Sequence, residues 1–119
     1  MSDSILISTK KILGIAADYT AFDVDIITHI NSAFATLNEL GVGPADGFMI
    51  FDDQTTWDAY LQFDFKLNAV KTYVYLRVRL LFDPPTTSYM INALKEQREE
   101  LEWRLNVIRE YGLSAEEVS

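Results

Sequence analysis

The chain has 119 residues, of which 49% are hydrophobic and 13% aromatic, and it contains no cysteine. This composition supports one hydrophobic core and excludes disulfides, thiolate catalysis and Cys-ligated metal sites. The formal net charge of −8, from 18 acidic and 10 basic residues, disfavours binding to nucleic-acid phosphates or to anionic membranes. The expected partners are therefore other proteins, with at most passive proximity to DNA.

No secretory signal and no membrane-spanning segment is expected. The first apolar stretch is interrupted by Lys10 and Lys11, and the uncharged runs are too short to cross a bilayer. We expect a single helical domain over residues 1–119, with an ordered core from about 4 to 111 and a flexible tail over 112–119.

Two helices are predicted in the first third of the chain. Residues 3–13 place apolar side chains on one face, and Gly14 is a typical C-terminal stop. From Asp23, which can cap a helix, apolar residues recur at three- and four-residue intervals as far as Leu40, and Gly41 follows. The second stretch is the clearest amphipathic helix of the sequence.

The helical spacing is lost between Gly41 and Lys66. Glycines and Pro44 indicate turns, the apolar run 48–51 favours a short strand that would allow a small β-hairpin, and the residues before Trp57 can begin a short helix. Six aromatic side chains fall in this loop, so we expect it either to pack over the core or to dock on a partner. They are Phe48, Phe51, Trp57, Tyr60, Phe63 and Phe65.

Two more helices are predicted after the loop. Residues 67–82 are apolar nearly all round, which indicates a central buried helix, although the alternation over 75–80 also fits a strand. Asp83-Pro84-Pro85 ends that segment. A long helix then begins at Thr86, Thr87 or Ser88 and runs to about Tyr111. One line of side chains along it is apolar except for Arg98: Ile91, Leu94, Arg98, Leu101, Leu105 and Ile108. The predicted fold is an all-α bundle of about four helices.

The sequence offers no catalytic, cofactor-binding or metal site. A hydrolase triad needs a histidine beside a nucleophile and an acid, and the single histidine, His29, lies on the flank of an amphipathic helix. The acidic pairs Asp23/Asp25 and Asp52/Asp53 are interpreted as helix caps, because neither lies in a calcium-loop pattern. We therefore expect a protein that is not an enzyme and has no cofactor.

Two regions favour contacts with other proteins. Trp103 lies off the apolar line of the last helix, so its ring either folds back onto the core or is an exposed anchor; tryptophan and arginine are frequent in interface hot spots. The candidate interface residues are Phe48, Phe51, Trp57, Phe63, Phe65, Arg98, Trp103 and Arg104. The last helix also carries an acidic stretch that could meet a basic partner: Glu96, Glu99, Glu100 and Glu102.

The order of these segments resembles a known family. A short helix, an amphipathic helix beginning Asp23-Val24-Asp25-Ile26-Ile27, an aromatic loop, a buried helix ending before Pro84-Pro85 and a long Glu/Arg-rich helix together resemble the head–tail connector, or neck adaptor, proteins of tailed bacteriophages. The most telling stretch is 71–88, and the resemblance extends from about Ser4 to Ile108.

The resemblance implies a structural virion protein. Such a subunit would form a homo-oligomeric, dodecameric ring beneath the portal protein, extend the DNA channel and bind the next neck or tail protein. In such a ring the candidate DNA-channel acidic face is formed by Glu96, Glu99, Glu100 and Glu102. It would lie in the neck of the virion, after assembly in the host cytoplasm. Two alternatives stay open, namely another phage assembly or tail-completion protein, and an acidic regulatory protein that mimics nucleic acid. A mimic should be monomeric and bind one basic protein, whereas an adaptor should assemble with a portal.

Overall fold

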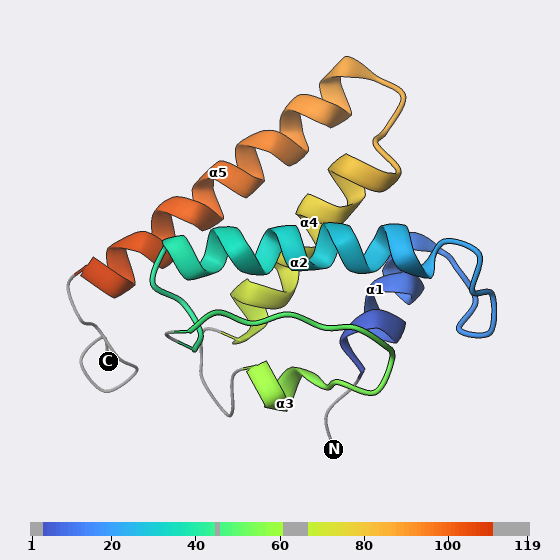
Figure 1. The fold of residues 1–119 in the computed structure, drawn as a ribbon. Coiled ribbons are helices and arrows are strands. Elements are labelled where there is room, and N and C mark those ends of the chain that lie inside the picture. The colour runs from blue at the N-terminus through green and yellow to red at the C-terminus, as the bar shows by residue number, and fades with distance from the viewer. Residues whose placement is uncertain (1–3, 45, 61–66, 111–119) are drawn as a thin grey trace.

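The computed structural model describes residues 4–44, 46–60 and 67–110, with side chains described over 68–106 in the last range. These residues form five helices and no strand (Figure 1). The helices are α1 (Ile5–Leu13), α2 (Asp23–Glu39), α3 (Trp57–Tyr60), α4 (Leu67–Phe82) and α5 (Ser88–Glu110). The prediction of a small all-α protein with a long last helix is confirmed.

Helix α1 has a defined cap at each end. The Ser4 hydroxyl accepts a hydrogen bond from the Ile7 amide, which satisfies one of the free donors of the first turn. At the other end Gly14 adopts a left-handed conformation with φ 80°, which a residue with a side chain rarely adopts. Ile5 and Leu6 are buried, and α1 packs against α2 and α4.

The core lies between α2 and α4. The buried residues of α2 follow the predicted helical spacing, and those of α4 interlock with them at the point where the two helices cross (Figure 1). They are Ile26, Ile30, Ala33, Phe34 and Leu37 on α2, and Val70, Tyr73, Val74 and Val78 on α4. The prediction that 67–82 forms the central buried helix is confirmed, and the strand alternative over 75–80 is wrong.

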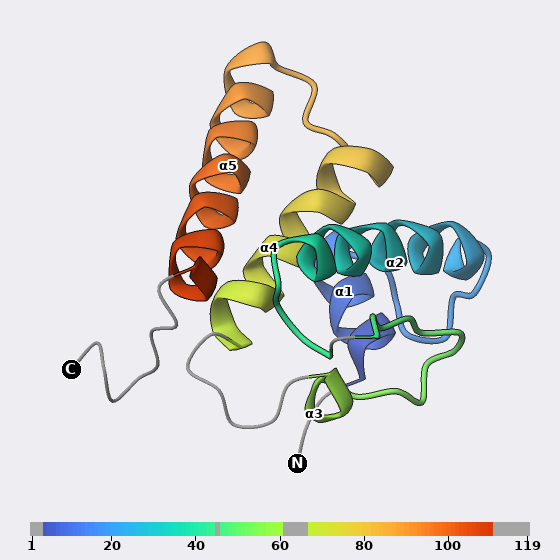
Figure 2. The same ribbon diagram turned by 60° about the vertical axis from the view of Figure 1, so that its left-hand side comes forward.

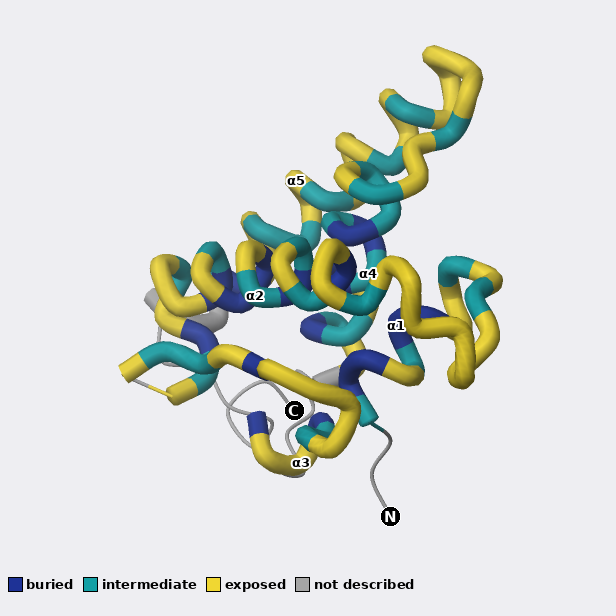
Figure 3. The backbone as a smooth tube through the Cα atoms, turned by 45° about the vertical axis from the view of Figure 1, so that its right-hand side comes forward, coloured by how far each residue is buried: buried dark blue, intermediate teal, exposed yellow. Residues whose placement is uncertain are grey.

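Helices α4 and α5 form a hairpin that projects beyond α2 (Figures 1 and 2). The apolar line of α5 faces α4: Leu105 is buried, and Ile91, Leu94 and Leu101 are partly buried. Exposure increases towards the tip of the hairpin, as Figure 3 shows. Because α5 packs on α4 along one side, its opposite side remains at the surface.

The loop between α2 and α3 packs partly on the core. The described residues 46–56 contain no β-hairpin. Their only β-bridge within the described part of the chain is an isolated one between Thr56 and Ser4. The predicted short helix is present as α3. Gly43, at φ 90°, lies so close to Tyr60 that an added Cβ would meet its ring at 2.6 Å. Phe63, Phe65 and the tail 112–119 lie outside the described residues.

Candidate protein-interaction surfaces

The outward face of α5 combines aromatic and acidic side chains. Tyr89, Glu96 and Trp103 follow one another at seven-residue intervals, or about two helical turns, and so lie along one line of the helix. Tyr89 is 81% exposed and Trp103 is 66% exposed. Glu99 and Glu100, also exposed, flank this line. The Trp103 ring is therefore exposed and does not fold back onto the core, which was the other predicted position.

The two candidate arginines of α5 lie away from the line through Trp103. Arg104 donates a hydrogen bond from Nη2 to Glu100 Oε1 at 2.7 Å, which is the predicted same-face pair. Arg98 lies on the apolar line that faces α4 and is partly buried, with Nη2 4.0 Å from Glu99 Oε1. Arg98 is therefore less accessible to a partner than Trp103 or Arg104.

Glu102 differs from the other three candidate glutamates because it belongs to the contact between α4 and α5. The Tyr73 hydroxyl donates to Glu102 Oε2 at 2.6 Å, and Arg77 Nη1 donates to the same hydroxyl at 3.2 Å. Burial, together with the hydrogen bond to Glu102, raises the pKa of Tyr73 to about 12, so this hydroxyl stays a donor at neutral pH. Glu102 therefore joins two helices instead of facing outward with Glu96, Glu99 and Glu100.

The aromatic loop divides into a buried part and an exposed part. Trp57 is completely buried, its ring packs edge-on against Phe34, and its Nε1 donates to Ser8 Oγ at 3.0 Å. Phe48 is partly buried against Phe34 and Tyr60. Phe51, by contrast, is 77% exposed. Trp57 thus serves the core rather than the predicted interface, because its indole is enclosed by the chain's own helices.

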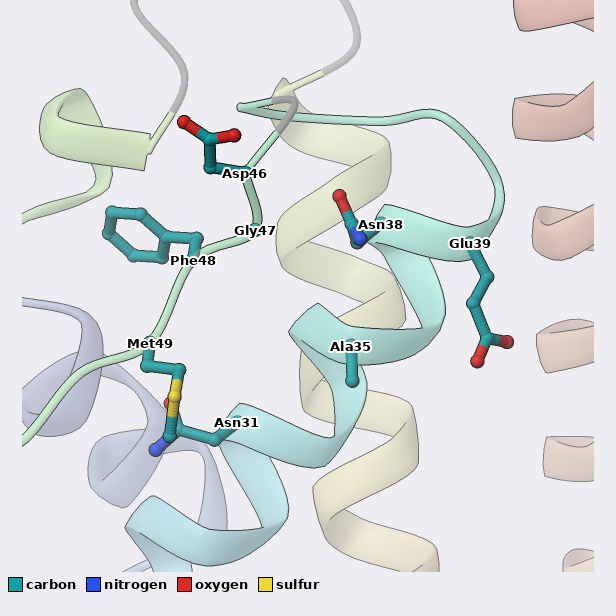
Figure 4. A pocket seen from close by; sticks show the side chains of 8 residues that line it. All are labelled: Asn31, Ala35, Asn38, Glu39, Asp46, Gly47, Phe48 and Met49. Atoms are coloured by element: carbon teal, nitrogen blue, oxygen red, sulfur yellow. The ribbon is translucent and has the colours of Figure 1, made fainter.

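A pocket of about 590 Å³ lies between α2 and the loop (Figure 4). One wall is formed by Asn31, Ala35, Asn38 and Glu39 of α2, and the other by residues 46–49. A second, more apolar groove of about 220 Å³ lies where α1 meets the α4–α5 hairpin, and it is lined in part by Ile12, Leu76, Met90 and Leu94. Both hollows are open at the surface.

Sequence reasoning missed the role of Lys10. This lysine is 1% exposed, and its Nζ donates to the carbonyls of Ala17 at 3.0 Å and Tyr19 at 2.7 Å. The same nitrogen lies 2.9 Å from Asp23 Oδ1. Lys10 therefore fixes residues 14–22, which join α1 to α2. The prediction that Asp23 caps α2 is wrong, because Phe22 occupies the N-cap position and no side chain makes a cap hydrogen bond there. Asp23 acts instead through its ion pair with Lys10.

The described part of the chain contains no cluster of three or more His, Cys, Asp or Glu residues placed to hold a metal ion. His29 packs its ring near that of Phe82, at 6.5 Å between centroids. Within the described residues, no helix is both long enough and apolar enough to cross a bilayer.

The fold and these surfaces define a small all-α protein that displays aromatic and acidic side chains on a projecting hairpin and on a loop. Comparison with protein families matches residues 5–112 to the phage connector proteins. The chain belongs to this family, which is a family of bacteriophage structural proteins. Searches of curated proteins and of solved structures found no significant match. The resemblance noted in the sequence is thereby confirmed, and it assigns a connector-type structural role.

Proposed function

We propose that this chain is a head–tail connector subunit that forms a homo-oligomeric ring beneath the portal protein in the virion neck. The ring would extend the DNA channel and bind the next neck or tail protein. Membership of the connector family supports this role, and the dodecameric symmetry implied by the resemblance is part of the proposal.

The observation that carries the proposal is the outward face of α5. A ring needs two different patches on each subunit, because head-to-tail contacts close by rotation. Trp103, 66% exposed on a projecting helix, is the side chain best placed to anchor one patch. Phe51, 77% exposed on the loop, belongs to a separate surface that can bind a different neck or tail protein.

The prediction that Glu96, Glu99 and Glu100 line the DNA channel concerns this same face of α5. Trp103 lies among these glutamates, so a neighbouring subunit that covers the indole would also meet the acidic side chains. We infer that the face is chiefly a protein contact, because DNA phosphates would be repelled by the glutamates and would leave the indole uncovered.

The test is assembly with the portal protein of the same phage. The full chain should form a ring on the portal in electron micrographs and sediment with it, even if the free chain is monomeric. Trp103→Ser should lower the affinity of ring assembly about thirtyfold, which corresponds to the loss of one interface anchor of about 2 kcal/mol.

Val24→Ser is the matched control, because Val24 is an apolar side chain of α2 that is 77% exposed and remote in sequence from α5. Both variants should keep the thermal stability of the original chain. Failure of the unaltered chain to assemble with the portal would refute the connector proposal. Equal assembly by Trp103→Ser would refute the assignment of the α5 face.

A further inference from the structure

We propose that the loop segment 48–51 is a docking edge for an extended, lysine- or arginine-bearing segment of a different protein, which would pair with it as an added β-strand. The inference deepens the proposed function by giving the chemistry of one partner. It rests on backbone pairing, side-chain exposure and charge around this segment.

The first observation is the pairing of Ile50 with Asn31. The Ile50 amide donates to Asn31 Oδ1 at 2.8 Å, and Asn31 Nδ2 donates to the Ile50 carbonyl at 2.9 Å. One side-chain amide thus makes the two bonds that a neighbouring strand would make with one residue. Asn31 of α2 therefore takes the place of a strand on one edge of the segment.

The other edge of the segment has no such partner. Met49 and Phe51, on either side of Ile50, form no hydrogen bond in the described part of the chain. In an extended chain, successive residues direct their backbone groups to opposite edges, so those of Met49 and Phe51 lie on the edge away from Asn31. A row of unpaired amides and carbonyls is a template for another strand.

Side-chain exposure alternates along the segment, as it does along a strand. Ile50 is completely buried, whereas Met49 is 56% and Phe51 77% exposed. Figure 3 shows the loop that contains this segment crossing the surface largely as exposed chain. An added strand would bring its own apolar side chains beside Met49 and Phe51, and so would cover both.

The charge around the segment identifies the occupant. Residues 46–60 contain four aspartates, Asp46, Asp52, Asp53 and Asp58, and no lysine, arginine or histidine. A segment carrying Lys or Arg is electrostatically complementary to this surface. Every basic residue of the described part of this chain lies in a helix, so a second copy offers no extended basic segment there. We therefore assign the occupant to a different protein and treat a second copy as one outcome of the test.

The experiment uses the full chain and a blocked peptide of alternating lysine and valine as the probe. Binding should slow amide hydrogen exchange at Met49 and Phe51, measured by NMR, and leave exchange in the exposed first turn of α2 unchanged. A fully N-methylated peptide of the same sequence has no amide donors. It should bind at least about tenfold more weakly, because about two backbone hydrogen bonds are lost. Phe51→Ser should weaken binding of the unmethylated peptide.

Four results would overturn the inference. Equal binding of the N-methylated peptide, or no protection of Met49 and Phe51, would exclude strand pairing. Equal binding of a glutamate–valine peptide would exclude the charge argument. Protection that grows with protein concentration in the absence of peptide would identify a second copy as the occupant. Trp103→Ser should bind the peptide normally, so failure of ring assembly and failure of strand pairing are distinguished.

Discussion

At the scale of single residues, the most consequential side chain is Lys10. Its ammonium group is almost completely enclosed and bonds to two carbonyls and to Asp23. Lys10→Met keeps the side-chain length but leaves the Asp23 carboxylate without its cation. Since removing one partner of a buried pair costs about 3 kcal/mol, we expect unfolding in urea at a clearly lower midpoint.

Lys11→Met is the control, because Lys11 is the exposed neighbour on the same helix. It should stay within about 0.5 kcal/mol of the original chain. Equal effects of the two substitutions on stability would show that the ion pair does not fix residues 14–22 between α1 and α2. Sequence alone could not reveal this difference. The two lysines are adjacent and chemically identical, and only the path of residues 14–22 places Asp23 beside one of them.

At the scale of elements, Glu102 of α5 makes polar contacts with Tyr73 and Arg77 of α4 within the apolar packing of the hairpin. Tyr73→Phe removes the donor to Glu102 and should destabilise the chain by about 1–2 kcal/mol near pH 8. The folded-state pKa of Tyr73, about 12, lies above the ordinary tyrosine value of 10.0. The contribution of Tyr73 is therefore complete below pH 10 and is lost as the pH rises towards 12.

The stability difference between the original chain and Tyr73→Phe should therefore narrow as the pH rises above 10, measured by urea unfolding at successive pH values. Burial also raises the pKa of Tyr60, so the variant keeps a shallower pH dependence. Tyr89→Phe, on the exposed face of α5, should match the original chain near pH 8. A difference that widens with pH would contradict the direction of the pKa shift.

The elements were predictable where the local sequence decides them. Residues 67–82 form α4 with the expected bounds, because the apolar residues favour burial and Pro84 and Pro85 prevent continuation. The loop was not predictable to the same degree. The run 48–51 looks like a strand, but a hairpin needs a second strand, and the Asn31 side chain takes that place for Ile50. Whether a side chain can take the place of a strand depends on how α2 lies against the loop, and the spacing of residues does not reveal this.

At the scale of the whole molecule, the candidate surfaces were only partly predictable. Spacing placed Trp103 off the apolar line of α5, but whether its ring folds back depends on what packs beside the helix, and nothing covers it in the described chain. Trp57 and Phe51 have similar sequence surroundings and opposite fates, because Phe34 and Ser8 provide a buried site for the indole. The sequence did not distinguish Glu102 from the other three glutamates, and only its hydrogen bond with Tyr73 in the structure does so.

The acidic face of α5 gives the last prediction, which separates a protein contact from a DNA-channel lining. Reversal of Glu96, Glu99 and Glu100 to lysine leaves the Tyr73–Glu102 contact in place. It removes the surface ion pairs of Glu100 with Arg104 and of Glu99 with Arg98, and each such pair contributes at most about 1 kcal/mol. The free subunit should therefore stay folded. If a neighbouring subunit covers this face together with Trp103, the reversed charges meet the wrong surface and ring assembly on the portal should fail. Intact rings in particles that retain less DNA would instead assign the three glutamates to the channel, where screening acts over about 8 Å. Electron micrographs and the DNA content of the particles read out both outcomes.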